Sequence, residues 1–173
     1  GSGNRHAILA DVQKVLNGEE ERVVDIRPHE KGERFEELPM DKFAEPTRAF
    51  VKVEDGCNRR CAYCVIPRAR GPVRSRDEAS VLEELHRLSD AGYKEVVLTA
   101  ISLPSYGTDS GTSLVELIEK AAEVPGIERI RLGSLDPDML HDEDILRMAG
   151  VKKLCPQFHL SLQSGCDKTL RAM

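Results

Sequence analysis

The 173-residue sequence contains no tryptophan, few other aromatic residues and no apolar run near the ~20 residues that a membrane-spanning helix needs. With 30 acidic against 25 basic residues, it also lacks the net positive charge typical of nucleic-acid-binding proteins. Its N-terminus has no apolar signal-peptide core. These absences argue against a membrane protein and favour a cytoplasmic one, in which any contact with phosphate is local.

The cysteines are few but clustered. Of five in the chain, Cys57, Cys61 and Cys64 form a C-x3-C-x2-C motif, and without a secretory signal such thiols more often bind metal than pair with each other. Three thiolates can hold three corners of an iron–sulfur cube and leave one iron open, whereas structural zinc sites usually have four protein ligands. The spacing alone leaves both open. Cys155 and Cys166 lie at opposite ends of a strand expected at 157–164. At most Cys166 could therefore supply a fourth thiol ligand.

Positive charge is concentrated just after the third cysteine, at Arg68, Arg70, Arg74 and Arg76. Guanidinium groups match the geometry of carboxylate and phosphate, so these arginines are candidates for contacts with an anionic cofactor group or with RNA. The alternative is a solvated, charged face with no ligand.

The first part of the chain is irregular in pattern. Apolar spacing predicts a helix over 4–17, and a short β-branched run predicts a strand over 22–26. Residues 27–48 are rich in glutamate and interrupted by prolines, which is typical of a linker.

From Ala49 onward, strand and helix patterns alternate. Strands are expected at 49–54, 95–100, 127–134 and 157–164, with helices at 77–92, 113–124, 142–150 and from Asp167. Such alternation predicts an α/β fold with four neighbouring parallel strands and right-handed crossovers. Because ligands bind at the carboxyl ends of parallel strands, the four loops that follow the strands should converge on one site.

The cysteine motif in this position, with the aromatic Tyr63 before the third cysteine, resembles the radical S-adenosylmethionine (SAM) superfamily. The resemblance implies a partial (βα) TIM-like barrel in which Cys57, Cys61 and Cys64 hold a 4Fe-4S cluster. It also implies that SAM binds the open iron and is cleaved, by an electron from the cluster, to a 5′-deoxyadenosyl radical.

The flanking segments resemble one family within that superfamily, the methylthiotransferases: EGCNRRCAYCVIPRARGPVRSRD, AGYKEVVLTAISLPSYG, RIRLGSLDP and FHLSLQSGCDKTLRAM. They are most similar to the subgroup that converts N6-threonylcarbamoyladenosine beside the tRNA anticodon to its 2-methylthio form. This implies a transferase whose partners are the anticodon stem-loop of tRNA and an electron donor. Alternatives are a methylthiotransferase acting on isopentenyladenosine or a ribosomal protein, and a non-catalytic zinc module.

The same resemblance implies a domain plan. Residues 1–26 would end a flavodoxin-like N-terminal methylthiotransferase domain, 27–48 would be a linker, and 49–173 would begin the radical SAM core, truncated after about four strands. A second 4Fe-4S cluster is expected in the full-length protein, but its ligands are absent from this sequence. The chain is therefore expected to be a central fragment, inactive alone, with an exposed sheet edge.

Further cofactor contacts implied by the resemblance are Tyr63, Thr99, Ala100, Ser134, Asp136, Gln163 and Ser164. Ala100 stands where relatives usually have glycine, and Asp136 is one methylene shorter than their usual glutamate. An Asp-Pro dipeptide is also an ordinary turn. Gln163 shares a strand face with His159, for which a core role is the alternative. No residue is assigned a catalytic role.

Overall fold

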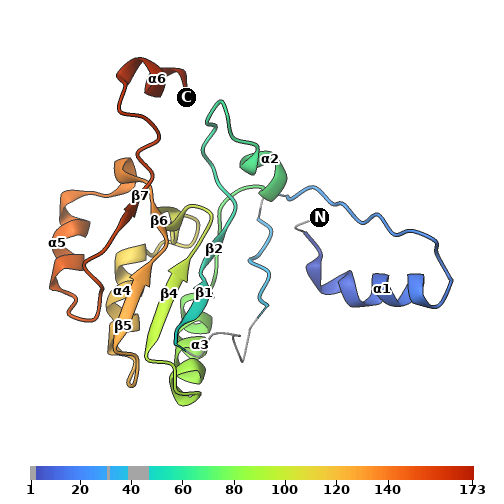
Figure 1. The fold of residues 1–173 in the computed structure, drawn as a ribbon, viewed down its shortest axis with the longest axis horizontal. Helices are drawn as coiled ribbons and strands as arrows, with labels where there is room; N and C mark the ends of the chain where they lie inside the picture. The colour runs from blue at the N-terminus through green and yellow to red at the C-terminus, as the bar shows by residue number, and fades with distance from the viewer. Residues whose placement is uncertain (1–2, 31, 39–46) are drawn as a thin grey trace.

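The structure is a computed structural model that describes residues 3–30, 32–38 and 47–173 (Figure 1). At its centre is a parallel sheet whose strands are, in spatial order, β1 (Ala49–Lys52), β4 (Glu95–Thr99) and β5 (Arg129–Leu132). Val96 of the central strand lies opposite Ala49 on one side and Ile130 on the other. The expected parallel α/β architecture is confirmed.

Two helices, α3 (Glu78–Asp90) and α4 (Leu114–Glu123), lie behind this sheet in Figure 1. The side chain of Asp77 caps α3 by accepting a hydrogen bond from the Ser80 N–H at 3.3 Å. Gly92, with a φ of 93°, carries the chain out of the helix. The helix therefore begins and ends where its capping residues predict.

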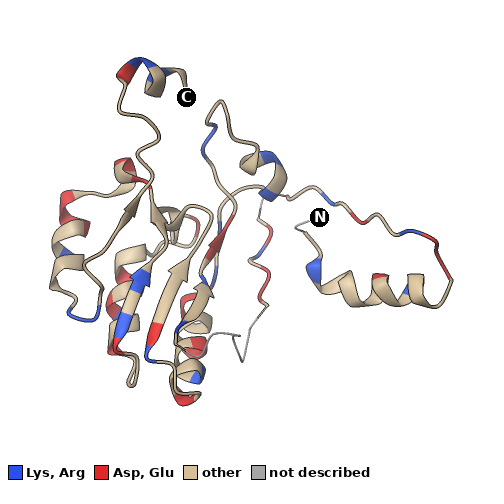
Figure 2. Ribbon diagram, in the orientation of Figure 1, with Lys and Arg blue, Asp and Glu red and all other residues tan. Residues whose placement is uncertain are grey.

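The two faces of the sheet differ because side chains alternate along each strand. One face contributes fully buried residues to the core: Ala49, Val51, Val96, Leu98 and Ile130. They pack together with Leu85 and Leu117 from the two helices. On the other face Arg129 and Arg131 form ion pairs with Glu95 at 2.9 and 2.7 Å, where Figure 2 shows basic and acidic residues side by side.

The fourth strand is much shorter than expected. Of 157–164, only β7 (His159–Leu160) is a strand, and it pairs in parallel with β6 (Ser134–Leu135), which follows β5 after Gly133. Leu160 and Leu162 are 50% and 65% exposed, so this strand buries no apolar face. Gln163 has a φ of 63°, which ends the extended conformation. The strand lies within the predicted range, but its predicted length was wrong, and it forms a two-stranded sheet with β6 instead of a fourth strand of the central sheet.

The N-terminal segment (residues 3–30 and 32–38) carries η1 (Arg5–Ala7) and α1 (Ile8–Leu16), which confirm the predicted helix. The strand predicted at 22–26 was wrong, because those residues are irregular and pair with no described strand. Val24 and Ile26 are mostly exposed, so a strand here would gain no stabilisation from burial of its apolar side chains. Two parts of the predicted linker, residues 31 and 39–46, lie outside the described residues.

A hairpin absent from the predictions frames the cysteine motif. β2 (Glu54–Asp55) pairs antiparallel with β3 (Arg74–Ser75), and between them runs the cysteine loop (residues 56–73), which includes α2 (Ile66–Arg70). The remaining helices are η2 (Leu103–Ser105), η3 (Pro137–Met139), α5 (Asp142–Gly150) and α6 (Asp167–Ala172). None of the helices in the described part of the chain is long and apolar enough to cross a membrane.

Candidate cofactor site

A cavity of about 610 Å³ lies at the carboxyl ends of the parallel strands. Its walls come from residues within 57–66, 101–102, 134–138, 161–163 and 170–173. The loops after successive strands meet here because parallel strands all end at the same edge of the sheet. The volume falls within the ~300–1,000 Å³ range of small-molecule pockets.

This cavity brings together half of the residues that the sequence singled out: Cys57, Cys61, Tyr63, Cys64, Ser134, Asp136 and Gln163. Three other proposed contacts lie off its wall. The Thr99 hydroxyl donates to the Val51 carbonyl at 3.4 Å, and Ala100 packs against the core. The Ser164 hydroxyl accepts the Cys166 N–H at 3.1 Å.

The cysteine loop is held by hydrogen bonds to its own return segment. The Cys57 N–H donates to the Gly71 carbonyl at 3.0 Å, and the Val73 N–H donates to the Asn58 side-chain oxygen at 3.1 Å. At the far side of the loop, the Ala62 N–H donates to the carbonyl of Met173 at 2.7 Å. The first thiol is thus fixed by the hairpin rather than by the sheet alone.

The thiol donors on the wall number three, not four. Cys155 is buried in an apolar groove elsewhere, and Cys166 is exposed and off the wall. No group of three His, Cys, Asp or Glu side chains among the described residues converges closely enough to hold a single metal ion. A four-iron cluster spreads its thiolates further apart than one ion does. The donor set therefore fits a 4Fe-4S cluster with one open iron better than a four-ligand zinc site.

Burial raises the pKa of the Cys57 thiol. The nearby Glu54 carboxyl and the other two thiols add to the rise, while the Arg59 N–H, 3.4 Å from the sulfur, works against it. The thiol is accordingly protonated at neutral pH when no metal is bound. Binding a metal centre must release this proton, so loading should be favoured by higher pH.

A buried carboxyl lies directly behind the cavity wall. Glu54 accepts the Ser102 N–H at 2.9 Å through Oε2, while its Oε1 is buried and has no hydrogen-bond partner among the described residues. Burial raises the pKa of Glu54 to about 7, and the charge of Asp55 adds to the rise. Ser102 lines the cavity and lies 3.2 Å from Asp136. Neither Glu54 nor Ser102 was predicted from the sequence as a site residue; the available signal was an acidic residue at the end of an apolar strand.

An ion pair that was not predicted from the sequence also spans the cavity wall. Arg59 of the cysteine loop forms an ion pair with Asp138 of η3, and both side chains line the cavity. Ser134 and Ser161 are also joined there, with their hydroxyl oxygens 2.5 Å apart. The loops after three different strands are therefore connected by polar side chains around one space.

The arginines predicted to contact anions all lie off the cavity wall: Arg68, Arg70, Arg74 and Arg76. Two of them are buried in internal ion pairs. Arg76 pairs with Glu84, and Arg74 lies 3.9 Å from the carboxylate of Asp55. Arg68 is exposed and forms no ion pair with the described part of the chain. The arginine-rich segment is therefore divided between internal pairing and solvent.

Comparison with known proteins gives matches over most of the chain. Over 166 residues it is 40% identical to the threonylcarbamoyladenosine tRNA methylthiotransferase MtaB of Thermotoga maritima, covering 95% of this chain and 37% of that protein. It is 38% identical to the tRNA-2-methylthio-N(6)-dimethylallyladenosine synthase of Pelotomaculum thermopropionicum, covering 100% of this chain and 39% of that protein. The chain thus spans about two fifths of the length of these relatives.

Among solved structures, the fold is similar to that of the radical S-adenosylmethionine methyltransferase TsrM from Kitasatospora setae. The TM-score is 0.57 at 19% identity, over 72% of this chain and 24% of that one. Residues 51–173, which carry the cysteine loop and every wall of the cavity, match the profile of the radical SAM superfamily. The chain belongs to the radical SAM superfamily, and within it is similar to tRNA methylthiotransferases.

Proposed function

We propose that this chain forms the radical SAM core of a tRNA methylthiotransferase that inserts sulfur and a methyl group at C2 of N6-threonylcarbamoyladenosine. Cys57, Cys61 and Cys64 would hold a 4Fe-4S cluster. The observation that carries the proposal is a single cavity lined by three thiols with no fourth on its wall. The names of relatives such as the Thermotoga maritima protein support the substrate.

In this proposal the remaining wall residues bind and orient SAM. When bound, the cluster supplies one electron to the cofactor. Ser134, Asp136 and Gln163 offer hydroxyl, carboxylate and amide groups to the polar parts of SAM, and Tyr63 offers an aromatic face. The exposed Arg68 is the contact we propose for RNA phosphate. The partial barrel, the domain plan, the cytoplasmic location and the tRNA and electron-donor partners belong to the same proposal.

The cluster assignment is tested by anaerobic reconstitution of the full chain with iron and sulfide. We expect ~4 iron and ~4 sulfide per site formed by this loop, and cleavage of SAM on reduction. Replacement of Cys57, Cys61 or Cys64 by alanine should abolish both. The matched control is Cys155→Ala, which removes a thiol far from the cavity and should leave iron content unchanged. Tight zinc without iron would contradict the assignment.

The substrate is tested separately, by measuring modified nucleosides in tRNA from cells that lack the gene. We expect loss of the 2-methylthio group from threonylcarbamoyladenosine only. A second candidate is dimethylallyladenosine, because the Pelotomaculum thermopropionicum relative that carries this name matches the whole chain at 38% identity. Loss of the 2-methylthio group from that nucleoside instead would favour the second candidate.

A further inference from the structure

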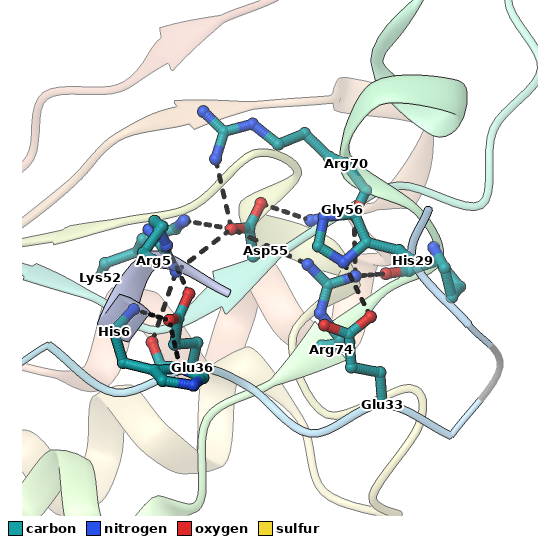
Figure 3. Close-up of polar contacts among 11 residues, drawn as sticks. Arg5, His6, His29, Glu33, Glu36, Lys52, Asp55, Gly56, Arg70 and Arg74 are labelled. Atoms are coloured by element: carbon teal, nitrogen blue, oxygen red, sulfur yellow. Dashed lines mark hydrogen bonds and ion pairs between the residues drawn. The ribbon is translucent and has the colours of Figure 1, made fainter. Parts of the chain in front are cut away.

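Asp55 is a buried carboxylate between the first core strand and the first thiol (Figure 3). Only 2% of the residue is exposed. Its Oδ1 accepts the Gly56 N–H at 2.9 Å, and its Oδ2 lies 2.5 Å from the Lys52 ammonium group. The carboxylate does not line the cofactor cavity. Its role must therefore be sought in the residues that it holds rather than in contact with a ligand.

The same carboxylate also reaches the far end of the cysteine loop. The guanidinium nitrogens of Arg70 and Arg74 lie 3.4 and 3.9 Å from its Oδ2. Arg74 in turn donates to the carbonyls of Arg70 and Pro72 at 2.8 and 3.0 Å. Asp55 thus connects the start of the cysteine loop, directly after β2, to its end, directly before β3.

A third connection runs from Asp55 to the N-terminal segment. The Arg5 guanidinium is 4.0 Å from the Asp55 carboxylate and 2.6 Å from that of Glu36. The His6 N–H donates to Glu36 at 2.9 Å, so the start of the segment is held to its later part. Figure 3 shows these groups converging from separate parts of the chain. One buried negative charge is therefore shared by three segments.

We propose that Asp55 is a positioning residue that couples the N-terminal segment to the cysteine loop and thereby fixes Cys57. Neutralising this buried carboxylate should be costly, because Arg74, which is buried beside it, then loses a negatively charged partner. Removal of the charge should directly weaken the hydrogen bond that Asp55 accepts from the Gly56 N–H. It should also release Arg70 and Arg74, and thereby weaken the hydrogen bond from the Cys57 N–H to the Gly71 carbonyl. The inference deepens the proposed function, since its consequence for a cluster depends on Cys57 being a ligand.

The test is amide hydrogen exchange of the full chain before any iron is added, in the isosteric variant Asp55→Asn and in Arg5→Gln. We expect exchange at Gly56 and Cys57 to accelerate about tenfold in Asp55→Asn and about threefold in Arg5→Gln, with β4 unchanged. The control is Asp90→Asn, which removes an exposed carboxylate at the end of α3 and should change nothing in the loop.

Unchanged exchange at Gly56 and Cys57 in either variant overturns the proposal, as does a uniform acceleration that includes β4. If Asp55→Asn fails to fold, Arg5→Gln decides alone, because Arg5 lies outside the core cluster. After reconstitution, we expect the iron content of Asp55→Asn to fall at least about twofold relative to Asp90→Asn. Failure of all variants and of the wild type to bind iron would contradict the proposed function, while the exchange result would still decide this inference.

Discussion

At the scale of single residues, Gly56 is a position that only glycine can occupy. Its φ is 91°, and a Cβ there would lie 1.9 Å from the Pro72 carbonyl oxygen. We expect Gly56→Ala to lower the free energy of unfolding by more than the ~1–2 kcal/mol of left-handed strain alone. The control is Gly111→Ala, where φ is 79° but a Cβ meets nothing within 4 Å. Equal losses in denaturant unfolding would contradict the clash.

Glu54 should make stability depend on pH. Because its pKa rises from an ordinary value of 4.5 to about 7, the folded protein holds this proton more tightly than the unfolded chain does. The stabilisation is fully present below about pH 4.5 and is lost as the pH rises through about 7. The Glu54→Gln side chain does not titrate. Between these pH limits the free energy of unfolding of wild type should therefore fall by on the order of 3 kcal/mol relative to that of the variant. Parallel pH profiles in urea unfolding would contradict this.

The residues of the site were predictable only in part. The position of the three cysteines on the cavity wall could be predicted, because their compact motif directly follows a predicted strand. Ser102, the Arg59–Asp138 pair and the contacts of Asp55 depend on which loops approach each other. That approach follows from packing, and no local spacing in the sequence encodes it.

At the scale of elements, α4 depends on its N-terminal capping box. The Glu116 N–H donates to the Ser113 hydroxyl, and the Ser113 N–H donates to the Glu116 carboxylate, both at 3.2 Å. We expect Ser113→Ala to cost about 1 kcal/mol in thermal or denaturant unfolding, because an N-terminal amide loses its partner. Ser110→Ala, in the exposed turn just before, should cost less than about 0.5 kcal/mol. Equal costs would contradict the role of the capping box.

The elements that the sequence predicted well are those with a buried face and clear capping residues. Helix α3 begins directly after its capping residue Asp77, and β4 is an apolar run that is buried along most of its length. The predictions failed at 22–26 and at most of 157–164, where β-branched or alternating residues exist but no neighbouring element covers them. A β-branched or alternating pattern forms a strand only where a neighbouring element packs against it or pairs with it. A short stretch of sequence does not show whether that neighbour is present.

At the scale of the whole molecule, stability should be unevenly distributed. None of the residues of α1 is buried, whereas β4 lies at the centre of the core. We expect the amides of α1 to exchange with solvent at least about a thousandfold faster than those of β4, because α1 opens without unfolding the core. Exchange followed by NMR or mass spectrometry measures both. Protection of α1 equal to that of β4 would contradict this ranking.

The construction of the cavity from distant parts of the chain has a consequence during synthesis. Its thiols precede Gln163, on the wall formed by the segment after β7, by 99 residues counted from Cys64. At typical ribosomal speeds, roughly 5 to 20 s pass between the emergence of the third thiol and of that wall. Throughout this interval the nascent chain presents three thiols that nothing encloses. The order of translation thus leaves the three thiols open to oxidation until the last residues of the wall, up to Met173, have been synthesised.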